Sequence, residues 1–287
     1  MQDFDQLWNY SDPAATELKF REVLNVLPAS QTSSYRAELL TQIARTYSLR
    51  YMFKEAHAAL EEARAILPVK AEVANIRYFL EKGRTLNYEG KRPEAKIEFL
   101  MAEQTAGELN EDFYRIDALH MLAIGVPPQE SIRMNEMAII MAEKSEQPKA
   151  KDWLGSLYNN LGWSYFDTGN YEKALSVFLR VLQWRIDKDL APGIFIAKWC
   201  VARTLRALNQ VDKAITIQLA LFEESTITGH PDGFVHEELG ELFLIKSEKQ
   251  KAGFHFEKAY SLLSTDPHLQ NTEKGRLERL KRLADGI

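Results

Sequence analysis

Two short groups of ionisable side chains have the residue types and spacing that catalysis or metal binding would need. Asp117 and His120 stand three residues apart, and on a helix this spacing lets a carboxylate orient an imidazole. The run HEELGE begins at His236 and brings Glu237 and Glu241 close to that histidine. It lacks the second histidine of an H-E-x-x-H zinc site, and no third ligand is evident. Packed or groove-facing histidines are the expected alternative, so no catalytic or metal site is predicted.

Other signals of catalysis are missing from the sequence. The motifs G-x-x-x-x-G-K-[ST], G-x-G-x-x-G and G-x-S-x-G, which hold phosphates, dinucleotides and a nucleophilic serine, do not occur. Cys200 is the single cysteine, which excludes an intramolecular disulfide and a cysteine-based zinc cluster. An isolated cysteine is more often a small buried residue than a nucleophile. We therefore expect neither an enzyme nor a bound cofactor.

The elements that would position binding residues follow from a repeat. A small residue returns at intervals of 38 to 40 residues, at Ala44, Gly83, Ala123, Gly162, Ala202 and Gly240. A second small residue follows twelve positions later in five of the six units, at Ala56, Ala95, Ala174, Ala214 and Ala252. This period is typical of stacked helical hairpins, each of which buries its apolar face against its neighbours. The sequence predicts an all-α solenoid in which paired helices cross closely at the small residues.

The clearest unit is LYNNLGWSYFDTGNYEKALSVFLRVL, residues 157–182. Its first helix carries Gly162 on an apolar face, Gly169 marks a turn, and Ala174 and Phe178 lie on the apolar stripe of a second helix. This order of small and large residues resembles the tetratricopeptide repeat (TPR) family. The resemblance implies a right-handed α-α superhelix of helical hairpins with a C-terminal capping helix.

The resemblance extends over nearly the whole chain. It implies six repeats within residues 31–270, forming one solenoid, at about 34–68, 73–108, 111–146, 153–187, 192–226 and 231–265. Residues 1–30 are expected to form an N-terminal partial repeat, and residues 271–287 a charged capping helix. In the third repeat the second small position is best matched by Ser131, eight residues after Ala123 instead of twelve, and Pro127-Pro128 lies at this deletion. We expect a change of curvature or a hinge there.

In this family the first helices line a concave groove. The resemblance places groove-facing side chains one residue after each small residue and two, three and six residues before it. The resulting candidates for ligand binding, with Arg206 one turn further along, are Arg45, Arg84, His120, Asn159, Asn160, Trp163, Trp199, Arg203, Arg206, Glu237 and Glu241. The alternative is that the arginines are solvated or pair with neighbouring glutamates and that the tryptophans are buried between repeats.

These residue types favour a protein- or peptide-binding adaptor that recognises a partner segment in the groove. Arginine binds carboxylates through paired hydrogen bonds, and tryptophan supplies an apolar anchor, so a partner of acidic and apolar character is expected. Reversing the charge of Arg84 and Arg203 should then weaken binding and leave folding unchanged. Two alternatives remain: a peptide-sensing regulatory protein that acts through another protein, and a self-associating structural protein, hence a homo-oligomer.

The composition of the chain limits the class of protein, its partners and its location in the cell. The chain has 287 residues, of which 45% are hydrophobic and 27% charged, as in a soluble globular protein. Its net charge of −5 offers no global attraction for nucleic acid or anionic membranes, so neither is an expected partner. The N-terminus MQDFDQLWNYSDP is acidic where a signal peptide is basic, and no apolar run reaches membrane-spanning length. A cytoplasmic protein is expected.

Overall fold

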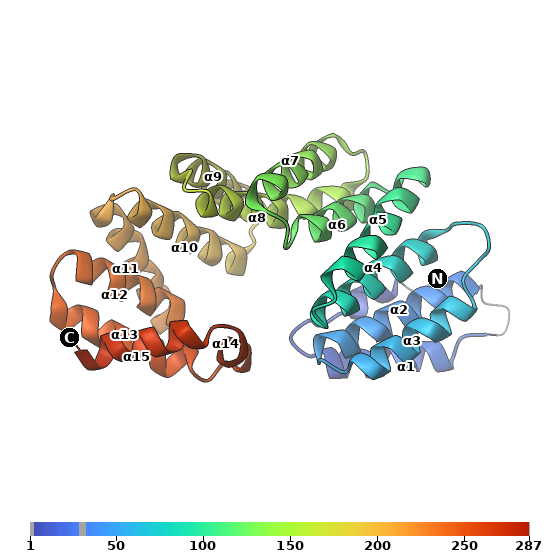
Figure 1. Ribbon diagram of the computed structural model, residues 1–287, viewed down its shortest axis with the longest axis horizontal. Coiled ribbons are helices and arrows are strands. Elements are labelled where there is room, and N and C mark those ends of the chain that lie inside the picture. Colours follow the sequence, from blue (N-terminus) through green and yellow to red (C-terminus); the bar gives the residue numbers. More distant parts are fainter. Residues whose placement is uncertain (1–2, 29–32, 287) are drawn as a thin grey trace. The chain divides into compact units, whose positions relative to one another are not determined.

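The computed structural model describes residues 3–28 and 33–286, and all regular elements within these ranges are helices (Figure 1). The all-α class predicted from the periodicity is confirmed. The ends of the expected partial repeat at residues 1–2 and 29–30, the first two residues of the repeat region, and Ile287 lie outside the described residues. No helix in the described part combines the length and the apolar composition that crossing a bilayer would need.

The helices form two compact units, the first ending at Leu157 and the second beginning at Tyr158. The first unit contains η1 (Phe4–Leu7), α1 (Pro13–Asn25), α2 (Ser33–Leu49), α3 (Phe53–Ala65), α4 (Val73–Tyr88), α5 (Arg92–Glu108), α6 (Asp112–Ala123), α7 (Pro128–Lys144), η2 (Pro148–Trp153) and the start of α8 (Leu154–Asp167). The second contains the rest of α8, α9 (Tyr171–Asp187), α10 (Ala191–Ala207), α11 (Val211–Ile227), α12 (Gly233–Ile245), α13 (Lys249–Leu263), α14 (Pro267–Thr272) and α15 (Lys274–Gly286).

Each turn inside a hairpin contains one residue with a left-handed backbone. The residues are Tyr51, Gly90, Gly125, Gly169, Asn209 and Ser247, with φ between 56° and 83°. In five of the six turns the next amide donates to a carbonyl of the preceding helix, for example Lys91 N to Leu86 O at 2.9 Å. This left-handed closure satisfies the last carbonyls of the first helix and reverses the chain within a few residues.

The small residue of each first helix lies where the second helix crosses it. In α4–α5, α8–α9 and α12–α13 it is glycine, and a phenylalanine sixteen positions later covers it. A Cβ added to these glycines would lie 2.4 to 2.7 Å from the ring in the pairs Gly83–Phe99, Gly162–Phe178 and Gly240–Phe256. The three phenylalanines are at most 3% exposed, so the ring has little room to move away.

The other three hairpins have alanine at the small position and a different residue in place of the phenylalanine. These residues are Leu60, Asn135 and Gln218, and all three are buried. Asn135 Nδ2 donates to Ser131 O at 2.9 Å, whereas neither amide atom of Gln218 has a hydrogen-bond partner among the described residues. A buried amide without partners opposes folding, so Gln218 lowers the stability of the α10–α11 hairpin.

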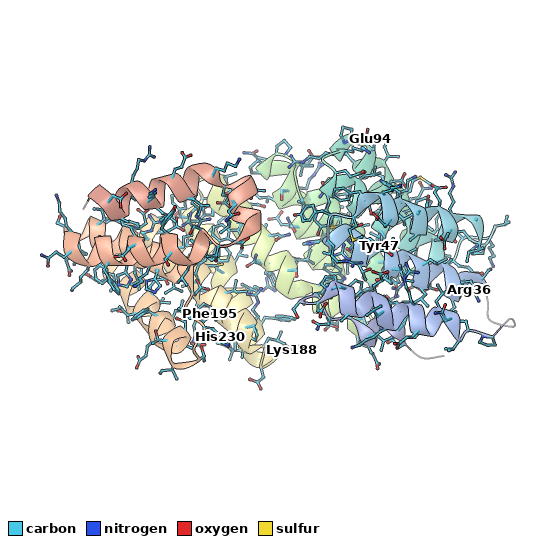
Figure 2. The ribbon with its side chains drawn as sticks, turned by 90° about the horizontal axis from the view of Figure 1, so that it is seen from below. Arg36, Tyr47, Glu94, Lys188, Phe195 and His230 are labelled. Carbon is cyan, nitrogen blue, oxygen red and sulfur yellow. The ribbon has the colours of Figure 1, made fainter. Side chains whose placement is uncertain are left out.

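Both ends of the chain pack on the repeats beside them. Phe4 of η1 meets the rings of Phe20 and Tyr35 at centroid distances of 6.2 and 5.2 Å. Within the first unit, Tyr47 (labelled in Figure 2) donates to Glu17 at 2.7 Å and so joins α2 to α1. Leu277 and Leu280 of α15 enter the apolar core around α12 and α13, so α15 caps the second unit.

Candidate functional site

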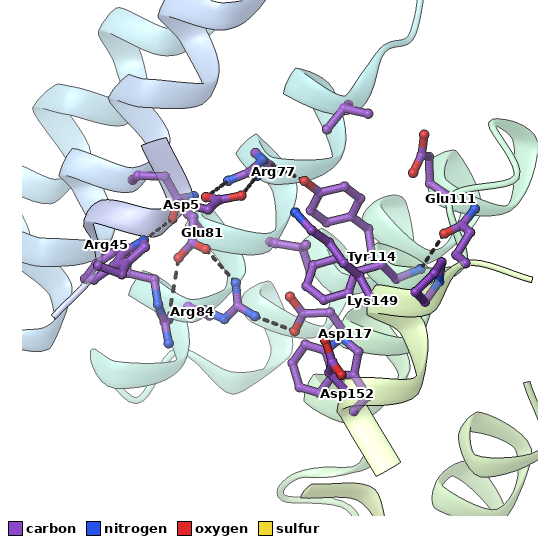
Figure 3. Close-up of a pocket in the computed structure, with 18 of the residues that line it drawn as sticks. Asp5, Arg45, Arg77, Glu81, Arg84, Glu111, Tyr114, Asp117, Lys149 and Asp152 are labelled. Atoms are coloured by element: carbon purple, nitrogen blue, oxygen red, sulfur yellow. Dashed lines mark hydrogen bonds and ion pairs between the residues drawn. The ribbon is translucent and has the colours of Figure 1, made fainter. Parts of the chain in front are cut away.

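The first unit contains a pocket of about 880 Å³. Its walls come from the first helices α2, α4 and α6 and from two segments outside the repeats, residues 5–10 and 146–153. The aromatic residues Trp8, Tyr10, Phe113, Tyr114 and Trp153 line it together with ten ionisable side chains, several of which Figure 3 labels. A pocket of this size can enclose a peptide side chain with its flanking backbone.

A buried ion-pair network forms one side of the pocket. Arg84 Nη1 donates to Glu81 Oε1 at 2.6 Å, and its Nη2 donates to Asp117 Oδ1 on the next first helix (Figure 3). Arg45 Nη1 lies 3.5 Å from Glu81 Oε2. Arg84, Glu81 and Asp117 are each at most 8% exposed. The network therefore ties together α2, α4 and α6 and leaves Arg84 with both sides of its guanidinium group occupied.

Arg77 is a second buried cation of the pocket. Its guanidinium group donates to both carboxylate oxygens of Asp5, at 2.9 and 2.5 Å, and to the hydroxyl of Tyr114 at 2.9 Å. Glu38 Oε2 lies 3.2 Å from Arg77 Nε. Burial raises the pKa of Tyr114 to about 12, and burial also raises the pKa of Glu38, which Arg77 opposes and nearby carboxylates reinforce. Through Asp5, this cluster fastens the N-terminal segment to α4.

The two segments outside the repeats close the pocket at opposite ends. On one side, Trp8 stacks on Tyr10 at a centroid distance of 4.6 Å, and its indole N–H donates to Gln42 Oε1 at 3.0 Å. On the other, Gln147 Nε2 donates to Asn110 O at 2.7 Å, which holds the segment containing η2 against the start of α6. An exposed ion pair of 3.6 Å between Lys149 and Asp3 joins the two segments.

Three of the binding residues predicted from the sequence, Arg45, Arg84 and His120, lie in the first unit. Arg45 and Arg84 line the pocket, but both are paired with carboxylates. His120 lies behind the pocket wall with its ring 5.2 Å from that of Trp153, and burial lowers its pKa. Asp117, which the sequence placed three residues from His120, accepts a hydrogen bond from Arg84. The pairing of arginines with neighbouring acids, the alternative considered from the sequence, is what the structure shows here.

In the second unit, two candidate tryptophans and two candidate arginines come together. The rings of Trp163 and Trp199 are 6.0 Å apart, and the guanidinium carbon of Arg203 lies 5.9 and 5.5 Å from them. Arg203 and Arg206 both donate to Glu238, which is 1% exposed. Trp199 also lines an apolar pocket of about 260 Å³ with Phe195 and three further residues, Ile196, Asp232 and Phe234.

The remaining candidates of the second unit are engaged within the fold. Arg276 of α15 binds both oxygens of Glu237, at 3.2 and 2.9 Å, and Arg279 lies 2.5 Å from Glu241. These carboxylates hold the capping helix against α12. Asn159 Oδ1 lies 3.9 Å from the thiol of Cys200, whose pKa burial raises to about 12. Asn160, beside it, is half-buried.

Sequence reasoning missed much of the first pocket. Trp153 and the N-terminal aromatic pair were not among the candidates, because the repeat pattern does not say where the segments that carry them will lie. Tyr114 lies inside the third repeat, nine residues before Ala123, and so at none of the offsets used for groove-facing positions. Arg77, Glu38 and Asp117 stand six residues before the small positions, which the family rule includes among groove-facing positions. Applying that offset fully would have found these three residues.

Among the described residues, no group of three or more His, Cys, Asp or Glu side chains is arranged to hold a metal ion. His236 faces His255 instead, with their Nδ1 atoms 3.0 Å apart in a core of phenylalanine rings. Burial and the neighbouring His236 lower the pKa of His255 to about 4, and burial and Lys258 lower that of His236. Both imidazoles are therefore held neutral.

This pair predicts a loss of stability in mild acid. An unfolded histidine titrates near pH 6.5, so below that pH the unfolded chain binds protons that the folded core excludes. Stability should fall by about 1–2 kcal/mol between pH 7 and pH 5, and His255→Phe should remove most of that slope. Urea unfolding across this pH range measures it, with the exposed His230→Gln as control. Equal slopes for wild type and His255→Phe would contradict the prediction.

The hairpins and their small–large crossings define a helical-repeat protein, and comparison with known proteins agrees. Residues 155–185 match the model of the tetratricopeptide repeat family. No protein of curated function matches the sequence. Among solved structures, the apo form of RapI is 13% identical and aligns over 99% of this chain and 81% of its own, with a TM-score of 0.71.

Two further structures have the same fold. The tetratricopeptide-repeat sensor protein of the STAND class (Signal Transduction ATPase with Numerous Domains) from Pyrococcus horikoshii is 17% identical and aligns over 96% of this chain and 44% of its own, with a TM-score of 0.70. NprR in complex with its cognate peptide NprX is 13% identical, with coverage of 97% and 81% and a TM-score of 0.60. Residues 155–185 thus match a tetratricopeptide repeat, and the whole chain has the helical-repeat fold of these structures, as its sequence pattern predicted.

Proposed function

We propose that this protein is a binding scaffold that receives a peptide, or an exposed segment of a partner protein, in the pocket of its first unit. The observation that carries the proposal is the pocket itself, which five aromatic side chains line and two non-repeat segments close. Aromatic side chains give large contact area at a low entropic cost and are frequent anchors in interfaces.

The likeness to NprR supports the same proposal, because that protein was solved with a bound peptide. It also favours a second candidate, a peptide-sensing protein whose output passes through another protein. For both candidates the initial event is the same: a peptide enters the pocket.

The acidic partner expected from the sequence stays a prediction. The arginines on which it rests already have carboxylate partners in both units, Glu81 and Asp117 in the first and Glu238 in the second. A carboxylate of the partner would have to displace one of these buried acids, which are held at hydrogen-bonding distance. Self-association is the other open alternative and would show as a mass that depends on concentration.

A blocked pocket tests the proposal. Val73 lines the pocket at the first residue of α4, so Val73→Trp should fill part of it. Val69 is fully exposed and does not line the pocket, which makes Val69→Trp the matched control. Immobilised full-length protein would select binders from a random peptide library, and the affinity of the selected peptides would be measured for all three proteins.

We expect Val73→Trp to weaken binding at least about tenfold, because a large anchor that loses its pocket costs more than 1.4 kcal/mol. Val69→Trp should bind like wild type. Circular dichroism would show that both variants are folded. No enrichment over a surface without protein, or equal affinity of wild type and Val73→Trp, would refute the pocket as the binding site.

A further inference from the structure

The pocket of the first unit has more acidic than basic side chains in its lining, six against four. Each of the four basic residues has a carboxylate partner: Arg77 binds Asp5, Arg84 binds Glu81 and Asp117, Arg45 faces Glu81, and Lys149 faces Asp3. By contrast Glu111, Glu146 and Asp152 line the pocket without an ion pair in the part of the chain that the structure describes. The pocket thus has unbalanced negative charge and no free cation in its lining.

These three carboxylates come from two elements that meet at the same wall. Glu111 precedes α6 and makes no side-chain capping bond, while Glu146 and Asp152 belong to the segment around η2 that packs on α6. Figure 3 shows Glu111 and Asp152 at the side of the pocket where Tyr114 and Lys149 lie. Burial raises the pKa of Glu38 on α2; the charge of Arg77 opposes this increase, and the charges of Asp5 and Glu111 add to it.

Aromatic rings cover the same wall. The ring of Phe113 lies 5.1 Å from that of Tyr114 and 5.9 Å from that of Trp153, measured between centroids. The face of an aromatic ring attracts a cation, most strongly when water is excluded. Rings beside unpaired carboxylates form the environment that an ammonium or guanidinium group prefers, because the rings hold its apolar stem and the carboxylates its charge.

We propose that this wall, formed by Phe113, Tyr114 and Trp153 with the carboxylates of Glu111, Glu146 and Asp152, binds a cationic group of the peptide. The cation is the N-terminal ammonium or the side chain of a lysine or arginine. The inference rests on the proposed function for the peptide itself, and it reverses the charge of partner that the sequence suggested. An anionic group would find every arginine of the pocket occupied and would approach three uncompensated carboxylates.

Three small probes of one shape test the charge preference directly. They are 2-phenylethylamine, 2-phenylethanol and 3-phenylpropionate, which share a benzene ring and differ in charge at pH 7. Titration of the full-length protein, followed by calorimetry and by the indole N–H resonances of Trp8 and Trp153, gives their relative affinities. We expect the amine to bind about tenfold more tightly than the propionate, with an advantage that shrinks as salt is added. Equal affinities, or tighter binding of the propionate, would overturn the inference.

A triple neutralisation locates the effect. Glu111→Gln/Glu146→Gln/Asp152→Asn should remove most of the amine's advantage while 2-phenylethanol binds as before. The control is Glu55→Gln/Glu62→Gln/Glu94→Gln, which changes the net charge equally at exposed positions of α3 and α5 outside the pocket lining. Glu94 lies at the outer edge of the first unit in Figure 2. If both triple variants change the amine's affinity equally, only the overall charge matters and the proposed wall is wrong.

Selected peptides separate this inference from the proposed function. Acetylation of either the N-terminus or the lysines of a library-selected peptide should weaken its binding about tenfold, depending on which ammonium enters the pocket. Some selected peptides could lack arginine, bind more weakly to Val73→Trp than to wild type, and keep their affinity after both acetylations. Such peptides would support the proposed binding pocket and refute the cation site. If the amine binds more tightly than the propionate but Val73→Trp does not change peptide affinity, the cation site is supported and the peptide-binding pocket is refuted.

Discussion

Arg84→Met should lower the free energy of unfolding by about 3–5 kcal/mol, because Glu81 and Asp117 lose the buried guanidinium group that both bind, and only Arg45 remains near Glu81. Glu81 and Asp117, 4% and 5% exposed, both bind this guanidinium group. Urea unfolding measures the change. Arg64→Met is the control, since Arg64 is 63% exposed, lies 4.0 Å from Glu61 and should change stability by less than about 0.5 kcal/mol.

A second substitution tests the reason for this loss. Adding Asp117→Asn to Arg84→Met removes one of the two stranded charges and should recover about 1–2 kcal/mol. A loss below about 1 kcal/mol for Arg84→Met would show that the network does not hold the three first helices together. The same geometry changes how charge reversal must be interpreted: Arg84→Glu would place three carboxylates in one buried cluster, so the expectation that it leaves folding unchanged does not fit this structure.

Gly162→Ala should destabilise the protein by about 2–3 kcal/mol, although alanine is the better helix former. Its Cβ would lie 2.4 Å from Phe178 Cε1, and Phe178 is fully buried. Overpacking a tight core typically costs about 1–3 kcal/mol, and here the ring or the whole second helix must shift. The helix propensity gained, about 1 kcal/mol, offsets only part of this loss.

Phe178→Leu should rescue Gly162→Ala. The first hairpin has Ala44 and Leu60 at the equivalent positions, sixteen residues apart and both buried, so the smaller pair is a packing solution that this chain already uses. Alone, Phe178→Leu should cost about 1–2 kcal/mol, and the double variant should be no less stable than that single one. A double-mutant cycle by urea unfolding would measure a favourable coupling of about 2 kcal/mol. Additive losses would contradict close packing of this pair.

The repeat period determined the helices and their crossings. Gly162 and Phe178 are informative in the sequence because the constraint is local: two helices joined by a short turn must approach closely, and only a small residue permits it. The same constraint acts at Gly83 and Gly240, so the sequence predicted the helical-repeat fold. The capping helix was predictable because Leu277 and Leu280 form an apolar stripe on one side of it, and this stripe can be buried against the core of the last repeat.

The charges of the candidate site were not predictable in this way. Arg84 finds Asp117 thirty-three residues further on, and Arg203 finds Glu238 at a distance of thirty-five. These separations approximate one repeat, so the partners meet only when first helices of adjacent repeats stack side by side. The sequence shows that an arginine lies on a helix face, but it does not show whether that arginine has a carboxylate partner.

The pocket itself was decided by tertiary structure. Residues 5–10 belong to the expected N-terminal partial repeat and residues 147–152 lie between two expected repeats, and no periodicity says that both segments lie against the first helices α2, α4 and α6. Their positions depend on single long-range contacts, such as Asp5 with Arg77, seventy-two residues apart. The sequence by itself determined the repeating scaffold, because every hairpin meets the same local packing constraint. Only the tertiary structure decided which segments close the pocket and which of its charges stay unpaired, because these outcomes depend on single long-range contacts that no repeat reproduces.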